Sequence, residues 1–190
     1  MNIGKTLYVS DRKSWRAWLA ENHDKEKEIW LIFYHKETGK PRIPYNDAVE
    51  EALCYGWIDS TVKALDHERF AQRFSVRKKT SGLSQANLER VRKLIKQKKM
   101  TKAGLDAIAH VFDPENDDVA SFVIPADILK ALKENEAAWE YFQKFPENYK
   151  RIRIAYIESR KRHGEEPYQR ALRYFIDMTA KNKRFGFIKE

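Results

Sequence analysis

The sequence is poor in cysteine and has no long apolar run. Its single cysteine, Cys54, excludes a disulfide within the chain, which is typical of proteins in a reducing compartment. The longest apolar run covers only residues 29–34 and is far too short to span a bilayer. The N-terminus shows neither an apolar signal core nor a lipidation motif. We therefore expect a cytoplasmic protein.

The sequence also lacks the motifs of several enzyme classes. Its 7 glycines are all isolated, so no phosphate-binding loop or dinucleotide fingerprint is present, and there is no nucleophile elbow. The 5 histidines show no spacing that places two on one helical face, which argues against a zinc site. We accordingly predict no catalytic residue, no metal and no cofactor.

Acidic residues are nearly absent from one stretch, residues 69–102, which we call the basic segment. It holds twelve Lys or Arg against one acid, Glu89, whereas the formal net charge of the whole chain is +9. The basic segment therefore accounts for the whole net positive charge of the chain. Such a local excess favours an anionic partner, but a solvated, lysine-rich helix surface explains the same pattern equally well.

The first half predicts strands mixed with helices. Residues 5–10 predict a short strand, and the continuous apolarity of 29–34 predicts a strand buried on both faces. Between them, Trp15, Trp18 and Leu19 recur at helical spacing. We expect Trp15, Trp18 and Trp30 to share one buried core with Leu53 and Phe74, which lie on apolar faces further along the chain.

A helix, two strands and a second helix should follow. The helix begins near Asn46 and ends at Gly56, since a residue without Cβ accepts the left-handed conformation at a helix end. Residues 58–64 alternate as a half-buried strand, and 69–77 form its partner. From Ser84 onward the apolar period becomes helical.

The second half predicts helices alone. An acidic turn over 113–118 separates the two parts, and three helices follow with prolines in their first turns: Pro125, Pro146 and Pro167. The predicted fold class is α+β, a small antiparallel sheet with packed helices followed by a helical C-terminal module. The predicted domains are residues 1–112, with the basic segment, and residues 119–190.

Residues 45–60, with the sequence YNDAVEEALCYGWIDS, carry a family resemblance. They are similar to the central signature of the YdeI/OmpD-associated (bacteriocin-protection) family, although Val76 and Leu83 stand where we expect Pro and Trp. The resemblance continues through Arg73, Arg77, Asn87 and Arg90, and into a C-terminal part similar to the family's small helical module. It implies a role in envelope stress or resistance to antimicrobial peptides, without a general catalytic mechanism.

Three groups within this signature carry reactive side chains. Glu50 and Glu51 diverge by about 100° on a helix, so we expect two solvent-facing residues instead of an acid pair. Cys54 has no neighbouring base in the sequence, which favours a buried structural thiol over a nucleophile. Asp59 is either a salt-bridge partner of a strand arginine or an acid or base.

Arginines recur every fourth residue along the strand at 69–77. A guanidinium group matches two oxygens of a carboxylate or phosphate at once, so this column suits an anion. Trp57 offers a stacking surface, although an aromatic residue in a signature is more often part of the core. The candidate ligand-binding residues are Trp57, Asp59, Arg73, Arg77, Asn87 and Arg90.

Three functions fit these features. The first is a non-catalytic binding or adaptor protein for an anionic small molecule or protein surface, in a stress or resistance context. The second is a nucleic-acid-binding protein that uses the whole basic segment, although no recognised reading motif is present. The third is an enzyme acting on an anionic metabolite, with Asp59 beside Arg73.

Overall fold

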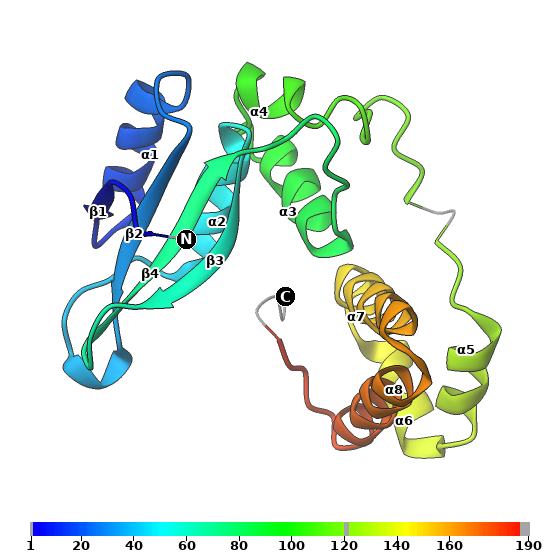
Figure 1. Cartoon of the computed structure of the whole chain (residues 1–190). Helices are drawn as coiled ribbons and strands as arrows, with labels where there is room; N and C mark the ends of the chain where they lie inside the picture. The colour runs from blue at the N-terminus through cyan, green and yellow to red at the C-terminus, as the bar shows by residue number, and fades with distance from the viewer. Residues whose placement is uncertain (1, 120–121, 187–190) are drawn as a thin grey trace. The chain divides into compact units, whose positions relative to one another are not determined.

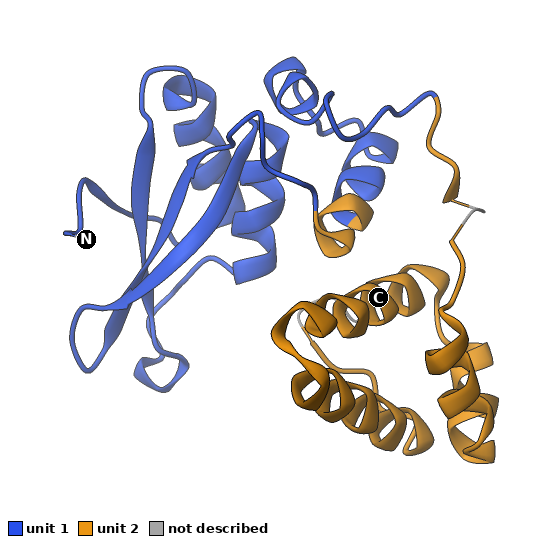
Figure 2. Cartoon of the chain, turned by 45° about the vertical axis from the view of Figure 1, so that its right-hand side comes forward, with its two compact units in different colours: residues 1–83, 90–115 blue, residues 84–89, 116–190 orange. Residues whose placement is uncertain are grey.

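The structure is a computed structural model that describes residues 2–119 and 122–186. The chain divides into two compact units, coloured separately in Figure 2. The first unit comprises residues 1–83 and 90–115, and the second comprises residues 84–89 and 116–190.

The first unit contains a four-stranded sheet with the order β1-β2-β4-β3 (Figure 1). Its strands are β1 (Thr6–Tyr8), β2 (Glu28–Tyr34), β3 (Trp57–Ala64) and β4 (Arg69–Val76). The predicted antiparallel pairing is confirmed for β2, β4 and β3. Strand β1 instead runs parallel to β2, because helix α1 returns the chain to the same end of the sheet between them.

The helices of the first unit begin and end where local signals indicate. They are α1 (Arg12–Asn22), the short 3-10 helix η1 (Lys36–Thr38), α2 (Tyr45–Cys54), α3 (Gln85–Lys96), which continues from the second unit, and α4 (Lys102–Asp106). Asp11 caps α1 by accepting a hydrogen bond from the Ser14 backbone N–H at 2.9 Å. Thr101 caps α4 in the same way. Gly56 follows α2 with a φ of 75°, as predicted for a helix end.

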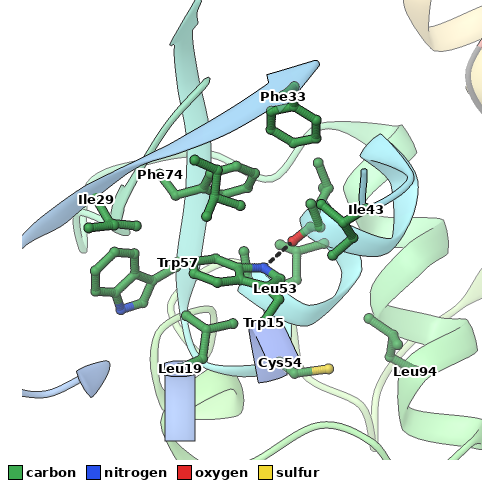
Figure 3. Close-up of a cluster of buried hydrophobic side chains, with 14 residues drawn as sticks. Trp15, Leu19, Ile29, Phe33, Ile43, Leu53, Cys54, Trp57, Phe74 and Leu94 are labelled. Carbon is green, nitrogen blue, oxygen red and sulfur yellow. Dashed lines mark hydrogen bonds between the residues drawn. The ribbon is translucent and has the colours of Figure 1, made fainter. Parts of the chain in front are cut away.

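Helices α1 and α2 pack on one face of the sheet and bury the core drawn in Figure 3. The Trp15 indole donates a hydrogen bond to the Ala48 carbonyl at 3.0 Å, which joins the two helices. Trp15, Leu53 and Phe74 lie in this core, as predicted. Trp30 is also fully buried, but it alternates with the core residues Ile29 and Leu31 and so projects from the other face of the sheet.

The second unit is helical, as predicted. Its helices are α5 (Ala126–Lys133), α6 (Glu136–Lys144), α7 (Glu147–Arg160), the 3-10 helix η3 (Lys161–His163) and α8 (Glu165–Ala180). The sequence predicts three helical segments here, whereas the structure has a further helix, α6. This helix is capped by Asn135, whose side chain accepts from the Ala138 N–H at 3.0 Å, so no proline marks its start. The helices share one apolar core that includes Phe142, Tyr149 and Phe175.

The variant Trp30→Ala tests the burial of strand β2. Because Trp30 is 0% exposed, its truncation should lower the free energy of unfolding by about 3–5 kcal/mol, measured by urea denaturation. Val62→Ala is the control, since Val62 is 55% exposed and its truncation should cost no more than about 0.5 kcal/mol. Equal losses from the two variants would contradict the assigned burial.

Candidate functional site

Of the six residues predicted to bind a ligand, Trp57 belongs to the core. Its ring is 0% exposed and packs edge-on against Trp18, with ring centroids 5.7 Å apart. Its indole N–H donates to the His23 carbonyl at 3.1 Å. Because neither ring face reaches solvent, Trp57 packs as a core residue and offers no stacking surface.

Asp59 and Arg90 come together at the first turn of α2. The Tyr45 hydroxyl donates to the Asp59 carboxylate at 2.7 Å, and Arg90 donates to the Asn46 side-chain oxygen at 2.9 Å. Burial, reinforced by the hydrogen bond to Asp59, raises the pKa of Tyr45 far above its ordinary value. Burial lowers the pKa of Arg90, and the nearby Tyr45 and Asp59 act in the opposite direction. These polar groups therefore hold α2 and α3 on β3.

The expected salt bridge between Asp59 and a strand arginine is wrong. Asp59 pairs in register with Phe74, and paired residues in an antiparallel ladder project from the same face, so Asp59 lies on the face that α2 covers. Arg73 follows Phe74 and projects from the other face. There it binds Glu28 of β2, with Nε 2.9 Å from the carboxylate, and this hydrogen bond lowers the pKa of Glu28.

Arg77 is buried without an acidic partner in the described chain. It is 4% exposed, and it donates to the carbonyl oxygens of Ser81 and Gly82 through Nη2. Its Nε and Nη1 atoms have no hydrogen-bond partner there, and burial lowers the pKa of Arg77. Asn87, the remaining predicted residue, lies in the first turn of α3, within the part of that helix that belongs to the second unit.

The expectation that Glu50 and Glu51 face solvent is wrong, because they are 6% and 1% exposed. Glu51 binds Arg12 and also Arg16, the latter at 2.5 Å. Glu50 binds Arg12 at 2.9 Å and Lys93 at 3.3 Å. Burial opposes the charge on Arg12, yet its bonds to the two glutamates raise the pKa of Arg12. Both carboxylates therefore contact the same guanidinium group, that of Arg12 on α1, and Lys93 on α3 contacts Glu50 as well.

Cys54 lies beside this network and is unsuited to nucleophilic attack. It is fully buried in the core, and burial together with the charge of Glu51 raises the pKa of Cys54 to about 11. A nucleophilic cysteine needs the opposite shift, since the thiolate is the reactive form. Its environment matches a structural thiol.

A pocket of about 610 Å³ lies between two helices of the second unit, and we call it the α7–α8 pocket. Its volume falls within the range of small-molecule sites, roughly 300–1,000 Å³. It is lined by Arg153, Tyr156, Ile157 and Arg160 of α7, by Pro167, Arg170, Ala171, Tyr174 and Phe175 of α8, and by Phe185 and Gly186. Tyr156 and Ile157, together with Tyr149 and Ile152, have the spacing of a core-facing helix, and this pattern does not indicate a pocket.

The α7–α8 pocket carries three arginines, and none of its described lining residues is acidic. The Arg153 guanidinium lies over the rings of Tyr149, Tyr156 and Phe185, at 5.6, 5.8 and 5.2 Å from their centroids. Its Nε atom is buried without a hydrogen-bond partner among the described residues, and burial lowers the pKa of Arg153. Arg160 lies over the Tyr156 ring at 5.9 Å. The pocket is therefore cationic and aromatic at once.

Within residues 2–119 and 122–186, no three His, Cys, Asp or Glu residues come together as metal ligands. In the same ranges, no helix combines the length and apolarity needed to cross a membrane.

Two family models match the chain. Residues 7–107 match a domain of unknown function (DUF8412), and residues 121–182 match the family described as "Bacteriocin-protection, YdeI or OmpD-Associated". No curated protein and no solved structure matches. The resemblance to the YdeI/OmpD-associated family is confirmed over residues 121–182, which include α7 and α8. The segment 45–60, predicted to be the central signature of that family, falls within the other match.

The variant Arg77→Met tests whether the fold requires the charge of this arginine. A buried guanidinium without a counter-ion costs free energy, but the variant also loses the bonds to the Ser81 and Gly82 carbonyls, so we expect urea denaturation to show a change of no more than about 1 kcal/mol. Arg73→Met is the control and should destabilise the protein, because it leaves Glu28 without its partner. A larger loss from Arg77→Met than from Arg73→Met would contradict this view of Arg77.

Proposed function

We propose that this chain, which belongs to the DUF8412 family through residues 7–107 and to the YdeI/OmpD-associated family through residues 121–182, is a binding or adaptor protein for an anionic ligand. The ligand binds in the α7–α8 pocket, whose α7 and α8 residues all lie within the second match. The description of that family, bacteriocin protection, favours a stress or antimicrobial-peptide resistance response, which we place in the cytoplasm.

The single observation that supports this function best is the environment of Arg153. Rings enclose its guanidinium on several sides, which stabilises a cation but supplies no hydrogen-bond acceptor. Its buried Nε–H has no hydrogen-bond partner among the described residues. A buried donor left unsatisfied costs about 1–3 kcal/mol. A carboxylate, sulfate or phosphate group in the pocket, which the Arg153 side chain lines, supplies the counter-charge that the rings lack.

Arg160 and Arg170 reinforce the attraction from both helices. Arg160 lies one turn beyond Tyr156 on α7, and Arg170 lies on α8. The bond between Arg170 and Glu166 is long, at 3.4 Å, and highly exposed, so it leaves the charge of Arg170 largely available. Three guanidinium groups without an acid among the described lining residues favour an anion, because they attract it from a distance and bind it with forked N–H donors.

The basic segment supports a polyanion less well. Arg69 binds Asp66 at 2.6 Å, and this hydrogen bond lowers the pKa of Asp66 to about 2. Arg73 binds Glu28, and Lys93 binds Glu50. Acids elsewhere in the first unit therefore offset part of the charge that suggested a nucleic-acid partner. The α7–α8 pocket, by contrast, combines three arginines with aromatic rings and has no acid among its described lining residues.

An Arg153→Met/Arg160→Met variant should lose anion binding. Phosphate, citrate and benzoate are titrated into the wild-type protein at constant ionic strength, and thermal unfolding of the second unit is followed by circular dichroism. An anion at about ten times its Kd should stabilise the wild type by roughly 1.4 kcal/mol and the double variant by much less. Methionine retains much of the apolar stem of arginine, so the variant should still fold.

Arg162→Met is the matched control. Arg162 is exposed in η3 of the same unit and does not line the pocket, so this variant removes a charge of the same kind. It should keep the stabilisation by anions. Stabilisation that persists in the Arg153→Met/Arg160→Met variant would contradict the proposed site. A wild-type protein that none of the three anions stabilises would contradict the proposed function.

A further inference from the structure

The walls of the α7–α8 pocket are mainly apolar, which an inorganic anion does not require. Ile157, Pro167, Ala171 and Phe175 line it together with the aromatic rings. A phosphate or sulfate ion fills only a small part of a pocket of about 610 Å³ and leaves these apolar walls in contact with water. Burial of apolar ligand surface against them contributes about 25 cal/mol per Å². The pocket thus suits an occupant with a large apolar part.

Two half-exposed tyrosines at the pocket indicate that the apolar part of the ligand is flat. Tyr156 of α7 is 48% exposed and Tyr174 of α8 is 51% exposed, so the two helices that line the pocket each present an open ring. Tyr174 is oriented by an edge-to-face contact with Phe185, with centroids 4.9 Å apart and planes at 76°. Aromatic rings gain free energy by stacking on flat ring systems, beyond the area they bury.

The charges lie close to one of these rings. Arg153 and Arg160 both lie within 6 Å of the Tyr156 centroid, at 5.8 and 5.9 Å. Gly186 adjoins Arg153 at the same pocket, and a Cβ atom on Gly186 would come within 2.6 Å of the Arg153 Nη1 atom. The backbone at Gly186 therefore packs directly on the guanidinium and limits its movement. A ligand that reaches these arginines also lies against the Tyr156 ring.

From these features we infer that the ligand of the α7–α8 pocket is a compact aromatic acid, a flat ring system that bears a carboxylate, sulfonate or phosphate group. This inference rests on the proposed anion-binding function and names its ligand class. The acidic group binds Arg153 and Arg160, and the ring system stacks with Tyr156 and Tyr174. Neither a simple inorganic anion nor an extended polyanion uses both features.

Three probes separate the acidic group from the ring system, and their affinities are measured by isothermal titration calorimetry. 1-Naphthoate has both features, citrate has only the charge, and 1-naphthalenemethanol has only the ring system. We expect 1-naphthoate to bind at least about tenfold more tightly than either of the others, a difference of about 1.4 kcal/mol. Its affinity should fall about tenfold or more in Tyr174→Ala, because that variant removes a stacking ring.

Arg173→Ala is the matched control on α8, since Arg173 is exposed and does not line the pocket. It should leave the affinity for 1-naphthoate unchanged. If citrate binds as tightly as 1-naphthoate, and the Arg153→Met/Arg160→Met variant abolishes both, the aromatic ligand class is wrong while the proposed function stands. If none of the anions binds the wild-type protein, both are wrong. Tight binding of 1-naphthalenemethanol equal to that of 1-naphthoate would also overturn the ligand class.

Discussion

A buried guanidinium group is stabilised by an anion or by the faces of aromatic rings, and the protein uses both solutions, whereas Arg77 donates only to carbonyl oxygens. In the first unit, the carboxylate of Glu51 lies between Arg12 and Arg16 and is almost completely withdrawn from solvent. Removing one partner from such a group leaves a buried charge and typically costs 3–5 kcal/mol. The packing of α1 against α2 therefore depends on these charges as well as on the apolar core.

In the second unit, a buried arginine is stabilised by aromatic rings instead of acids. Arg153 is surrounded by rings in place of carboxylates, which stabilises its charge but leaves its Nε–H without an acceptor in the described chain. Arginines of the first kind serve the fold, since their acids belong to the chain itself. Arginines of the second kind remain able to bind an anion from solution. This distinction, more than the total positive charge, locates the site that we propose.

Local patterns in the sequence were sufficient for most of the first unit. The apolar run at 29–34 predicted β2, and alternation predicted β3 and β4, because half-buried strands must alternate. The side-chain partners were not predictable in this way. Glu50 and Glu51 carry no local sign of burial, since the arginine partners of Glu51 come from a helix more than 30 residues earlier in the chain. Long-range packing decided their environment.

The site was missed for a related reason. Tyr156 and Ile157 recur at the spacing of a core-facing helix, and periodicity alone does not separate a core from the wall of a pocket. Two arginines, Arg153 and Arg160, do distinguish a pocket wall from a core, because they place cations on the same helical face as the apolar residues. The basic residues of the basic segment are concentrated in sequence, which favoured that segment as the anion site. Several of them, however, bind acids of the first unit.

The most direct test of whether Arg153, instead of an arginine of the basic segment, binds the anion is an NMR titration that follows arginine Nε–H signals. Protein labelled with ¹⁵N is titrated with an aromatic carboxylate, and the Nε–H signals are assigned by single arginine substitutions. We predict that the Arg153 signal shifts, because an anion binds its guanidinium group, while the Arg73 signal stays in place, because its Nε–H already donates to Glu28. Shifts confined to Arg73, Arg77 or other residues of the basic segment would contradict it.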